Sequence, residues 1–314
     1  MYTIGVDLGG TNIVSGVIDE NHAIISKATA KTELPRPSDS ILDDIAMLAG
    51  KAAHAAGLKL SDISYLGVGT PGGVDAAGGV VEFSNNLDFK NLPMAHMLRE
   101  RLGIPVYIEN DANCAALGEQ LAGCGKGAED LTAVTLGTGI GGGIVTGGKI
   151  LHGINGTAGE IGHMSIDPNG IQCSCGRRGC FEKYASATAL ISQTKQAMKE
   201  HKESYMWSLC EGDPDKVNGK TAFDGAEAGD STAKAVVDRY IFYLACGITN
   251  LVNIFQPEIL CIGGGICNQG DTLLVPLREI VEKERYSKFS VRQTSIVRAV
   301  LGNDAGLIGA GSLI

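Results

Sequence analysis

The sequence predicts an α/β protein made of two related halves, each a sheet with crossing helices. Two observations predict this class. An apolar strand followed at once by a glycine turn occurs in both halves, as YTIGV before DLGGT and as LTAVTL before GTGIGGG. The 44 glycines among the 314 residues also gather at the ends of apolar runs, where sharp turns are needed, and show no fibrous period.

The first half alternates strands and helices. Residues 40–56 have the spacing of an amphipathic helix, for which Ser40 and Asp43 form a capping box. A second helix is expected near 92–102, and a third over 111–123, ending at a glycine. Strands are expected at 2–6, 13–19, 23–30, 64–69 and 104–110.

The second half repeats this order of elements without repeating the residues. Strands are expected at 131–136, 144–148 and 257–262, with glycine turns at 137–143 and 263–266. Residues 187–255 are expected to be mostly helical, with 231–254 as one long helix. The last twelve residues, 303–314, are expected to form a closing helix, and no function is assigned to the polar segment 203–220.

Composition excludes several classes of protein. The net charge is −9, whereas nucleic-acid binding needs a basic face. The start MYTIGVDLGG has no basic segment before an apolar core, so no signal peptide is expected, and no apolar run is judged long enough to span a bilayer. Nine scattered cysteines do not suggest a disulfide framework. A cytoplasmic protein without a membrane partner is expected.

Three glycine turns are candidates for phosphate binding. Without Cβ atoms the backbone can turn sharply and bring its amides close to a ligand, and a helix start favours anions. One such turn is a weak signal, because it can be an ordinary tight hairpin, and none ends as a Walker loop does. The candidates are Asp7, Gly9, Gly10, Thr11 and Asn12 in the first turn, Gly137, Thr138 and Gly139 in the second, and Gly263, Gly264 and Gly265 in the third.

Asp111 is the candidate catalytic base. It follows an apolar strand, at the carboxyl end where open α/β sheets bind ligands. Phosphoryl transfer requires positioning, charge neutralisation and one acceptor for the hydroxyl proton. The alternative is that Asp111 only caps the helix that it begins.

Six motifs occur in the order and spacing of one known family. DLGGT, GVGTPG, ENDAN, LGTGIGGG, GEIGH and CSCGRRGCFE together resemble the ROK family of sugar kinases and repressors, closest to its glucokinase members. The resemblance runs from Asp7 to about Gly265. It implies a duplicated fold like that of actin, hexokinase and the Hsp70 ATPase domain, with sugar and ATP in a cleft between two α/β domains.

The resemblance also implies domains and site residues. The N-terminal domain would span 1–117, with the closing helix at 303–314 packed on it, and the C-terminal domain would span 118–302. Asp111 would be the base, and Mg²⁺ would accompany ATP. The residues that would line the sugar are Asn86, Asn110, Asp111, Glu160, His163 and Glu182.

Three cysteines and one histidine form the last candidate site. Cys173, Cys175 and Cys180 follow His163, and one His with three Cys gives a closed, structural zinc site within 163–180. The family resemblance supports zinc, whereas a disulfide would leave one cysteine over. A metal fixing His163 and Cys180 would also order Glu160 and Glu182 nearby.

The sequence therefore predicts ATP-dependent phosphorylation of a hexose, with glucose favoured by the likeness to glucokinase members. The alternatives are a kinase for N-acetylmannosamine, allose or fructose, and a sugar-sensing protein without catalysis. An actin-like or Hsp70-like ATPase would lack the cysteine cluster. Polyphosphate is an alternative donor, and family analogy suggests a homodimer or homotetramer.

Overall fold

The computed structural model describes residues 1–314, and the chain divides into two compact units. Unit 1 comprises Met1–Ala133, Gly143–Gly159 and Ala299–Ile314, and unit 2 comprises Val134–Gly142 and Glu160–Arg298. The chain passes between the units inside two neighbouring strands, β9 (Leu131–Leu136) and β10 (Ile140–Thr146), and again after Gly159 and after Arg298. The domain boundary expected between residues 117 and 118 stays a prediction.

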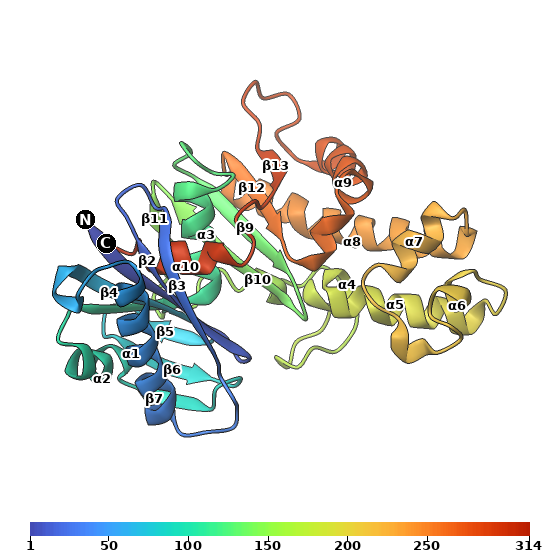
Figure 1. Ribbon diagram of the computed structural model, residues 1–314. Helices are drawn as coiled ribbons and strands as arrows, with labels where there is room; N and C mark the ends of the chain where they lie inside the picture. Colours follow the sequence, from blue (N-terminus) through green and yellow to red (C-terminus); the bar gives the residue numbers. More distant parts are fainter. The chain divides into compact units, whose positions relative to one another are not determined.

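The central sheet of unit 1 has five strands in the order β3-β2-β1-β4-β8. Figure 1 shows part of this sheet in blue, together with the label of α1 (Ser38–Ala55). β1 pairs with β2, and β2 with β3, in antiparallel fashion, whereas β1, β4 and β8 are parallel. The carboxyl ends of these three parallel strands therefore meet at one edge of the sheet. The strands are β1 (Tyr2–Leu8), β2 (Asn12–Ile18), β3 (Ile24–Lys31), β4 (Ile63–Thr70) and β8 (Val106–Asn110).

Helices cover both faces of this sheet. Ile4 and Val6 of β1 share an apolar core with α1 (Ser38–Ala55) and α2 (Met94–Leu102). The opposite face packs on α3 (Asp111–Ala122) and α10 (Asp304–Ala310). Glycine allows the close approach of α10, because a Cβ on Gly5 would lie 2.0 Å from the Leu307 carbonyl oxygen. The expected closing helix is thus present and lies against β1.

Unit 1 also contains a small antiparallel sheet that the sequence did not predict. It consists of β5 (Gly73–Asp75), β6 (Val80–Ser84) and β7 (Phe89–Leu92). Asn86 lies in the turn between β6 and β7 and is exposed.

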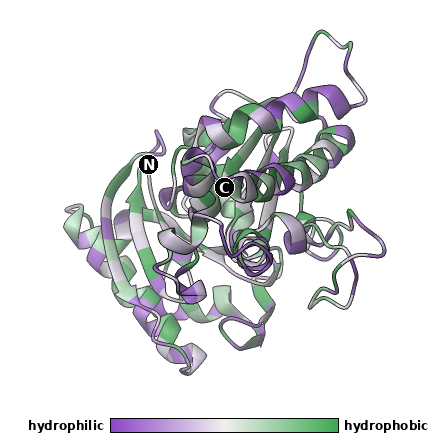
Figure 2. Cartoon of the chain, turned by 90° about the vertical axis from the view of Figure 1, so that its right-hand side faces the viewer, coloured by the Kyte–Doolittle hydropathy of each residue, from purple (hydrophilic) through white to green (hydrophobic).

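The second five-stranded sheet has the order β11-β10-β9-β12-β13. Its further strands are β11 (Lys149–Ile150), β12 (Ile259–Gly263) and β13 (Ser295–Arg298). The helices of unit 2 are α4 (Glu182–Ala185), α5 (Ala187–Glu200), α6 (Met206–Leu209), α7 (Thr221–Glu227), α8 (Ser231–Phe255) and α9 (Asp271–Glu284). Short 3-10 helices are η1 (Leu60–Asp62), η2 (Ile161–His163), η3 (Pro214–Lys216) and η4 (Gly265–Gln269). In Figure 2 the helices carry both hydrophobic and hydrophilic residues, as expected for helices with one buried side.

α8 is the predicted long helix, and it is capped by Asp230, whose carboxylate accepts from the Thr232 N–H at 2.8 Å. By length and composition this helix could cross a membrane, but Lys234, Asp238 and Arg239 interrupt it, so it is not a continuous apolar run. The reason for its apolar character is packing, since 61% of its most apolar window is buried. Tyr240, Leu244 and Ile248 lie in the core of unit 2.

Three local expectations need correction. α1 begins at Ser38 after Pro37, and no side chain caps it, so the capping box of Ser40 and Asp43 is absent. Gly141–Gly143 belong to β10 rather than to the turn, which is therefore confined to residues 137–139. Residues 263–266 lead into the short 3-10 helix η4, and the α-helix α9 starts only at Asp271.

Candidate active site

Asp111 stands at the carboxyl edge of the unit 1 sheet, where β8 ends and α3 begins. Asn110, rather than Asp111, is the N-cap of α3, since its side-chain oxygen accepts from the N–H groups of Ala112 at 2.9 Å and Asn113 at 3.2 Å. The Asp111 carboxylate accepts the N–H of Ala112, at 2.9 Å. The capping role is therefore filled by Asn110 and does not require Asp111.

Asp7 lies beside Asp111 in unit 1. Asp7 of β1 is in register with Gly69 of β4, and a Cβ on Gly69 would lie 3.7 Å from the Asp111 Cα. Burial raises the pKa of the Asp7 carboxyl to about 6, and the charge of Asp111 adds to this shift. Burial likewise raises the pKa of Asp111, with the Ala112 N–H opposing it. Two acids with raised pKa values at one sheet edge are typical of a functional site.

The first glycine turn follows Asp7 directly. The Gly9 N–H donates to the Asn12 carbonyl at 2.9 Å, which closes the turn between β1 and β2. The Thr32 hydroxyl donates to the Gly9 carbonyl at 2.6 Å and holds the turn from β3. Gly10, Thr11 and Asn12 are exposed. The turn thus presents its outer side to a ligand while its base is fixed.

The other two glycine turns lie together in unit 2. The Gly137 N–H donates to the Gly139 carbonyl at 3.0 Å, and the Ala187 N–H of α5 donates to the Gly137 carbonyl at 2.9 Å. Gly264 has a φ of 98°, and a Cβ there would lie 2.2 Å from the Leu136 carbonyl oxygen. Only glycine fits at this position, and its contact places the turn at 263–265 against the residue that precedes Gly137.

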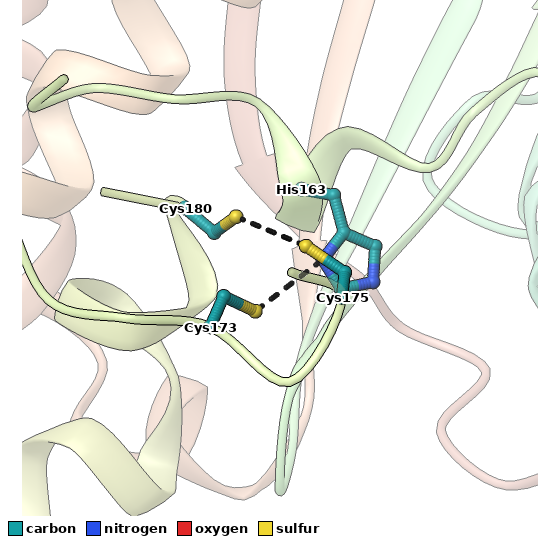
Figure 3. Close-up of side chains that lie close together, drawn as sticks. All are labelled: His163, Cys173, Cys175 and Cys180. Carbon is teal, nitrogen blue, oxygen red and sulfur yellow. Dashed lines mark hydrogen bonds between the residues drawn. The ribbon is translucent and has the colours of Figure 1, made fainter. Parts of the chain in front are cut away.

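Unit 2 also gathers the four predicted metal ligands (Figure 3). One ligand atom each from His163, Cys173, Cys175 and Cys180 lies within 4.8 Å of all the others. The Cys175 and Cys180 sulfurs are 3.5 Å apart, and the Cys173 sulfur is 3.8 Å from His163 Nδ1. Four ligands in a tetrahedron with Zn–S bonds of about 2.3 Å lie about 3.5 to 3.8 Å apart. The donor set and its spacing therefore fit zinc.

Tight turns bring these ligands together. Gly176 and Gly179 both have positive φ values, 90° and 74°. A Cβ on Gly179 would lie 1.6 Å from the Asp167 carbonyl oxygen, so this position requires glycine. None of the nine cysteines forms a disulfide in the structure.

Glu182 connects the cysteine cluster with the second glycine turn. Its Oε1 accepts from the Cys173 thiol at 3.1 Å and lies 3.8 Å from His163 Nδ1. Its Oε2 stands over Gly139, where an added Cβ would approach it to 2.6 Å. Glu160, directly before η2, is exposed, and its side chain contacts none of these groups.

The described geometry therefore forms two groups of predicted residues, one in each unit. Asp7, Asn110 and Asp111 gather at the edge of the unit 1 sheet. The second and third glycine turns, Glu182 and the four metal ligands gather in unit 2. Sequence reasoning passed over Glu109, which is buried directly before Asn110. The sequence signal that could have identified Glu109 is that it is a second acid, close to Asp111, at the end of an otherwise apolar strand.

Comparison with known proteins is consistent along the whole chain. The model of the ROK family matches residues 3–314. A glucokinase from Thermotoga maritima is 40% identical, over 99% of this chain and 96% of its own length.

Two solved structures also match this chain in fold along its whole length. A ROK family glucokinase from Streptomyces griseus, in complex with glucose and AMPPNP, has a TM-score of 0.81 at 35% identity and covers 100% of this chain and 99% of its own. A ROK hexokinase from Thermus thermophilus has a TM-score of 0.85 at 33% identity and covers 100% of this chain and 98% of its own. These likenesses confirm the predicted fold class, that of the actin and hexokinase type. The chain belongs to the ROK family.

Proposed function

We propose that this protein phosphorylates a hexose with ATP, and that glucose, converted to glucose 6-phosphate, is its principal substrate. The observation that carries the proposal is the Asp111 carboxylate. It is largely buried, it has a raised pKa, and it is not needed as a helix cap. The likeness to proteins named glucokinase, over nearly the full length of both chains, supports glucose as the sugar.

Asp111 acts as the general base in this proposal. It accepts the proton of the sugar 6-hydroxyl as that oxygen attacks the γ-phosphoryl group of ATP. A base works best when its pKa is near the working pH, and burial moves the pKa of Asp111 in that direction. The sugar is held by hydrogen bonds to hydroxyl groups from carboxylates, amides and an imidazole. The residues proposed for this are Asn86, Asn110, Asp111, Glu160, His163 and Glu182.

The glycine turns bind the phosphates. Their amides and hydroxyl groups neutralise charge that grows on the transferring group, which is the main requirement of phosphoryl transfer. Asp7 is proposed to hold the Mg²⁺ that accompanies ATP, directly or through water. The fit rests on its mostly buried carboxylate, which forms no protein ion pair and whose pKa of about 6 would fall beside a cation. Mg²⁺ would supply further charge neutralisation at the phosphates.

Zinc is proposed at His163, Cys173, Cys175 and Cys180, in a structural role. The protein fills all four tetrahedral positions, so no open position remains for water activation. The proposed contribution of zinc is to order the segment 163–180 and thereby Glu182, whose carboxylate already touches the cluster. His163 Nδ1 faces the cysteines, which leaves Nε2 for the sugar.

Two further properties are proposed by analogy. We place the protein in the cytoplasm, a proposal supported by nine cysteines without a disulfide and by the burial of its one long apolar helix. A homodimer or homotetramer is the proposed assembly.

A coupled assay that follows ADP production over a panel of hexoses tests the proposal. The panel should contain glucose, fructose, allose, mannose and N-acetylmannosamine, with ATP and polyphosphate as alternative donors. We expect the highest kcat/KM with glucose and ATP. A preference for another sugar would move the substrate assignment within the family. No turnover with any sugar, with binding intact, would favour a sugar-sensing protein.

A further inference from the structure

Glu109 is a buried acid that directly precedes Asn110 and Asp111. Only 2% of its surface is exposed. Its Oε1 accepts from the Asn110 N–H at 2.8 Å and from the Asn113 side-chain amide at 3.0 Å. Both donors belong to the cap or the first turn of α3, so this carboxylate oxygen fixes the backbone on either side of Asp111.

The second oxygen of Glu109 binds a different part of unit 1. Glu109 Oε2 accepts from His152 Nε2 at 2.5 Å. His152 follows β11 by two residues and begins a closed loop, because its carbonyl accepts the N–H of Ala158 at 3.0 Å. Gly156 anchors the same loop on β5, where an added Cβ would lie 2.1 Å from the Val74 carbonyl oxygen.

The loop of residues 152–158 leads directly to Glu160. It is therefore fixed at three points in unit 1: at Glu109, at Val74 and by its own closure. A buried carboxylate without partners is strongly unfavourable, so Glu109 favours the arrangement in which the three donors stay in place. The pair of Glu109 and His152 is thus the direct link between the start of α3 and the loop before Glu160.

We infer that Glu109 and His152 are positioning residues for the sugar site. Their pair holds Asn110, Asp111 and the loop 152–158 in one arrangement within unit 1, and with it the part of the proposed sugar site that Asn110 and Asp111 form. The inference rests on the proposed function. Neither residue is assigned a contact with the reacting atoms, and both act through the residues that they hold.

Variants of His152 test this role without endangering the fold. His152 is 43% exposed and borders an open cavity of about 1080 Å³ in unit 1, so a shorter side chain leaves the core packing intact. His152→Ala removes the donor to Glu109. His152→Gln restores an N–H donor near the position of Nε2 and serves as the rescue variant. His96→Ala is the matched control, since His96 also pairs with a glutamate, Glu100 at 3.5 Å, but is 67% exposed.

The kinetic constants of His152→Ala should change for glucose much more than for ATP. His152→Ala should raise KM for glucose and lower kcat, together by about 10² in kcat/KM, as misplacement of a site by about 1 Å can do. KM for ATP should change by less than about threefold, because the glycine turns are not held by this pair. His152→Gln should recover most of the loss, and His96→Ala should show none.

Hydrogen exchange provides a readout that does not depend on the substrate. In His152→Ala without ligands, peptides covering 110–115 and 151–160 should exchange faster than in the wild type, and in His96→Ala they should not. If the wild type lacks hexose kinase activity, the proposed function fails, and exchange alone decides the positioning role. Unchanged exchange in both peptides would overturn the inference. Faster exchange with wild-type kinetics for glucose would overturn it as well.

Discussion

Replacing Asp7 by Asn should stabilise the ligand-free protein at pH 8 and leave its stability unchanged near pH 4. Burial and the neighbouring Asp111 raise the pKa of Asp7 from 3.8 to about 6. The folded protein therefore binds the Asp7 proton more tightly than the unfolded chain does. Between about pH 4 and pH 6 the unfolded chain loses this proton first, so the wild-type free energy of unfolding falls as the pH rises through this window.

The size of the effect follows from the rise of the Asp7 pKa from 3.8 to about 6. At 1.36 kcal/mol per pKa unit, the ionised Asp7 lowers the free energy of unfolding by at most about 3 kcal/mol above pH 6. Solvent at its open side screens the charge and reduces this figure. Asn has the shape of Asp without the charge, so Asp7→Asn should recover this free energy at pH 8. Near pH 4 the wild-type side chain is protonated in the folded state, and the gain should largely vanish.

The assay is urea unfolding at pH 4, 5, 6 and 8, in buffer without magnesium or nucleotide. Asp224→Asn is the control, because Asp224 is exposed and has no side-chain partner. The two variants are compared with the wild type at each pH. An equal gain from Asp7→Asn at pH 4 and pH 8, or a loss of stability at pH 8, would refute the reasoning about this carboxylate.

Two further predictions concern unit 2. Metal analysis of the purified protein should find about one zinc per chain. Cys175→Ala should release the zinc and weaken glucose binding more than ATP binding. Unchanged glucose affinity in a zinc-free variant would contradict the structural role of the metal. Gly264→Ala should raise KM for ATP several-fold or prevent folding, since its φ is 98° and its Cβ would lie 2.2 Å from the Leu136 carbonyl. Gly50→Ala in α1 is the control, with no positive φ and nothing within 4 Å of its added Cβ. Equal effects of the two substitutions would argue against a shaped turn at this position.

Much of the fold could be predicted because strands such as β8, β9 and β12 have an apolar run that leads to a glycine or an acid. The bounds of the long helix α8 were predicted to within one residue. The bounds of the strands that lead to Asp7 and Gly263 were predicted to within two or three residues. The small sheet β5-β6-β7 was missed because its strands have three to five residues and lie among turn-forming residues. Such short segments carry too little periodicity to be distinguished from loops.

The start of α1 shows how tertiary context decides a helix boundary. Ser40 and Asp43 have the spacing of a capping box, but Pro37 permits the helix to begin earlier, at Ser38. Arg36 then bonds the Ser40 carbonyl and pairs with Asp44, contacts that a pattern of residue types does not reveal.

The residues of the candidate site could be predicted from the sequence, but the residues that hold them in position could not. The spacing of His163 and the three cysteines predicted a cluster that the structure brings within ligand distance. The role of Glu109 could not be predicted, because strict alternation along β8 would place it on the same face as the exposed Tyr107. It is buried by His152, which lies 43 residues later in the chain.

The most direct test of the proposed phosphoryl transfer is the kcat of Asp111→Asn with glucose and ATP, measured beside glucose binding by calorimetry. Asn keeps the size of the side chain and removes the proton acceptor. We expect kcat to fall by about 10² to 10⁴, with glucose binding retained within about tenfold. A kcat near that of the wild type would contradict the assignment of Asp111 as the base, and with it the central claim of this account.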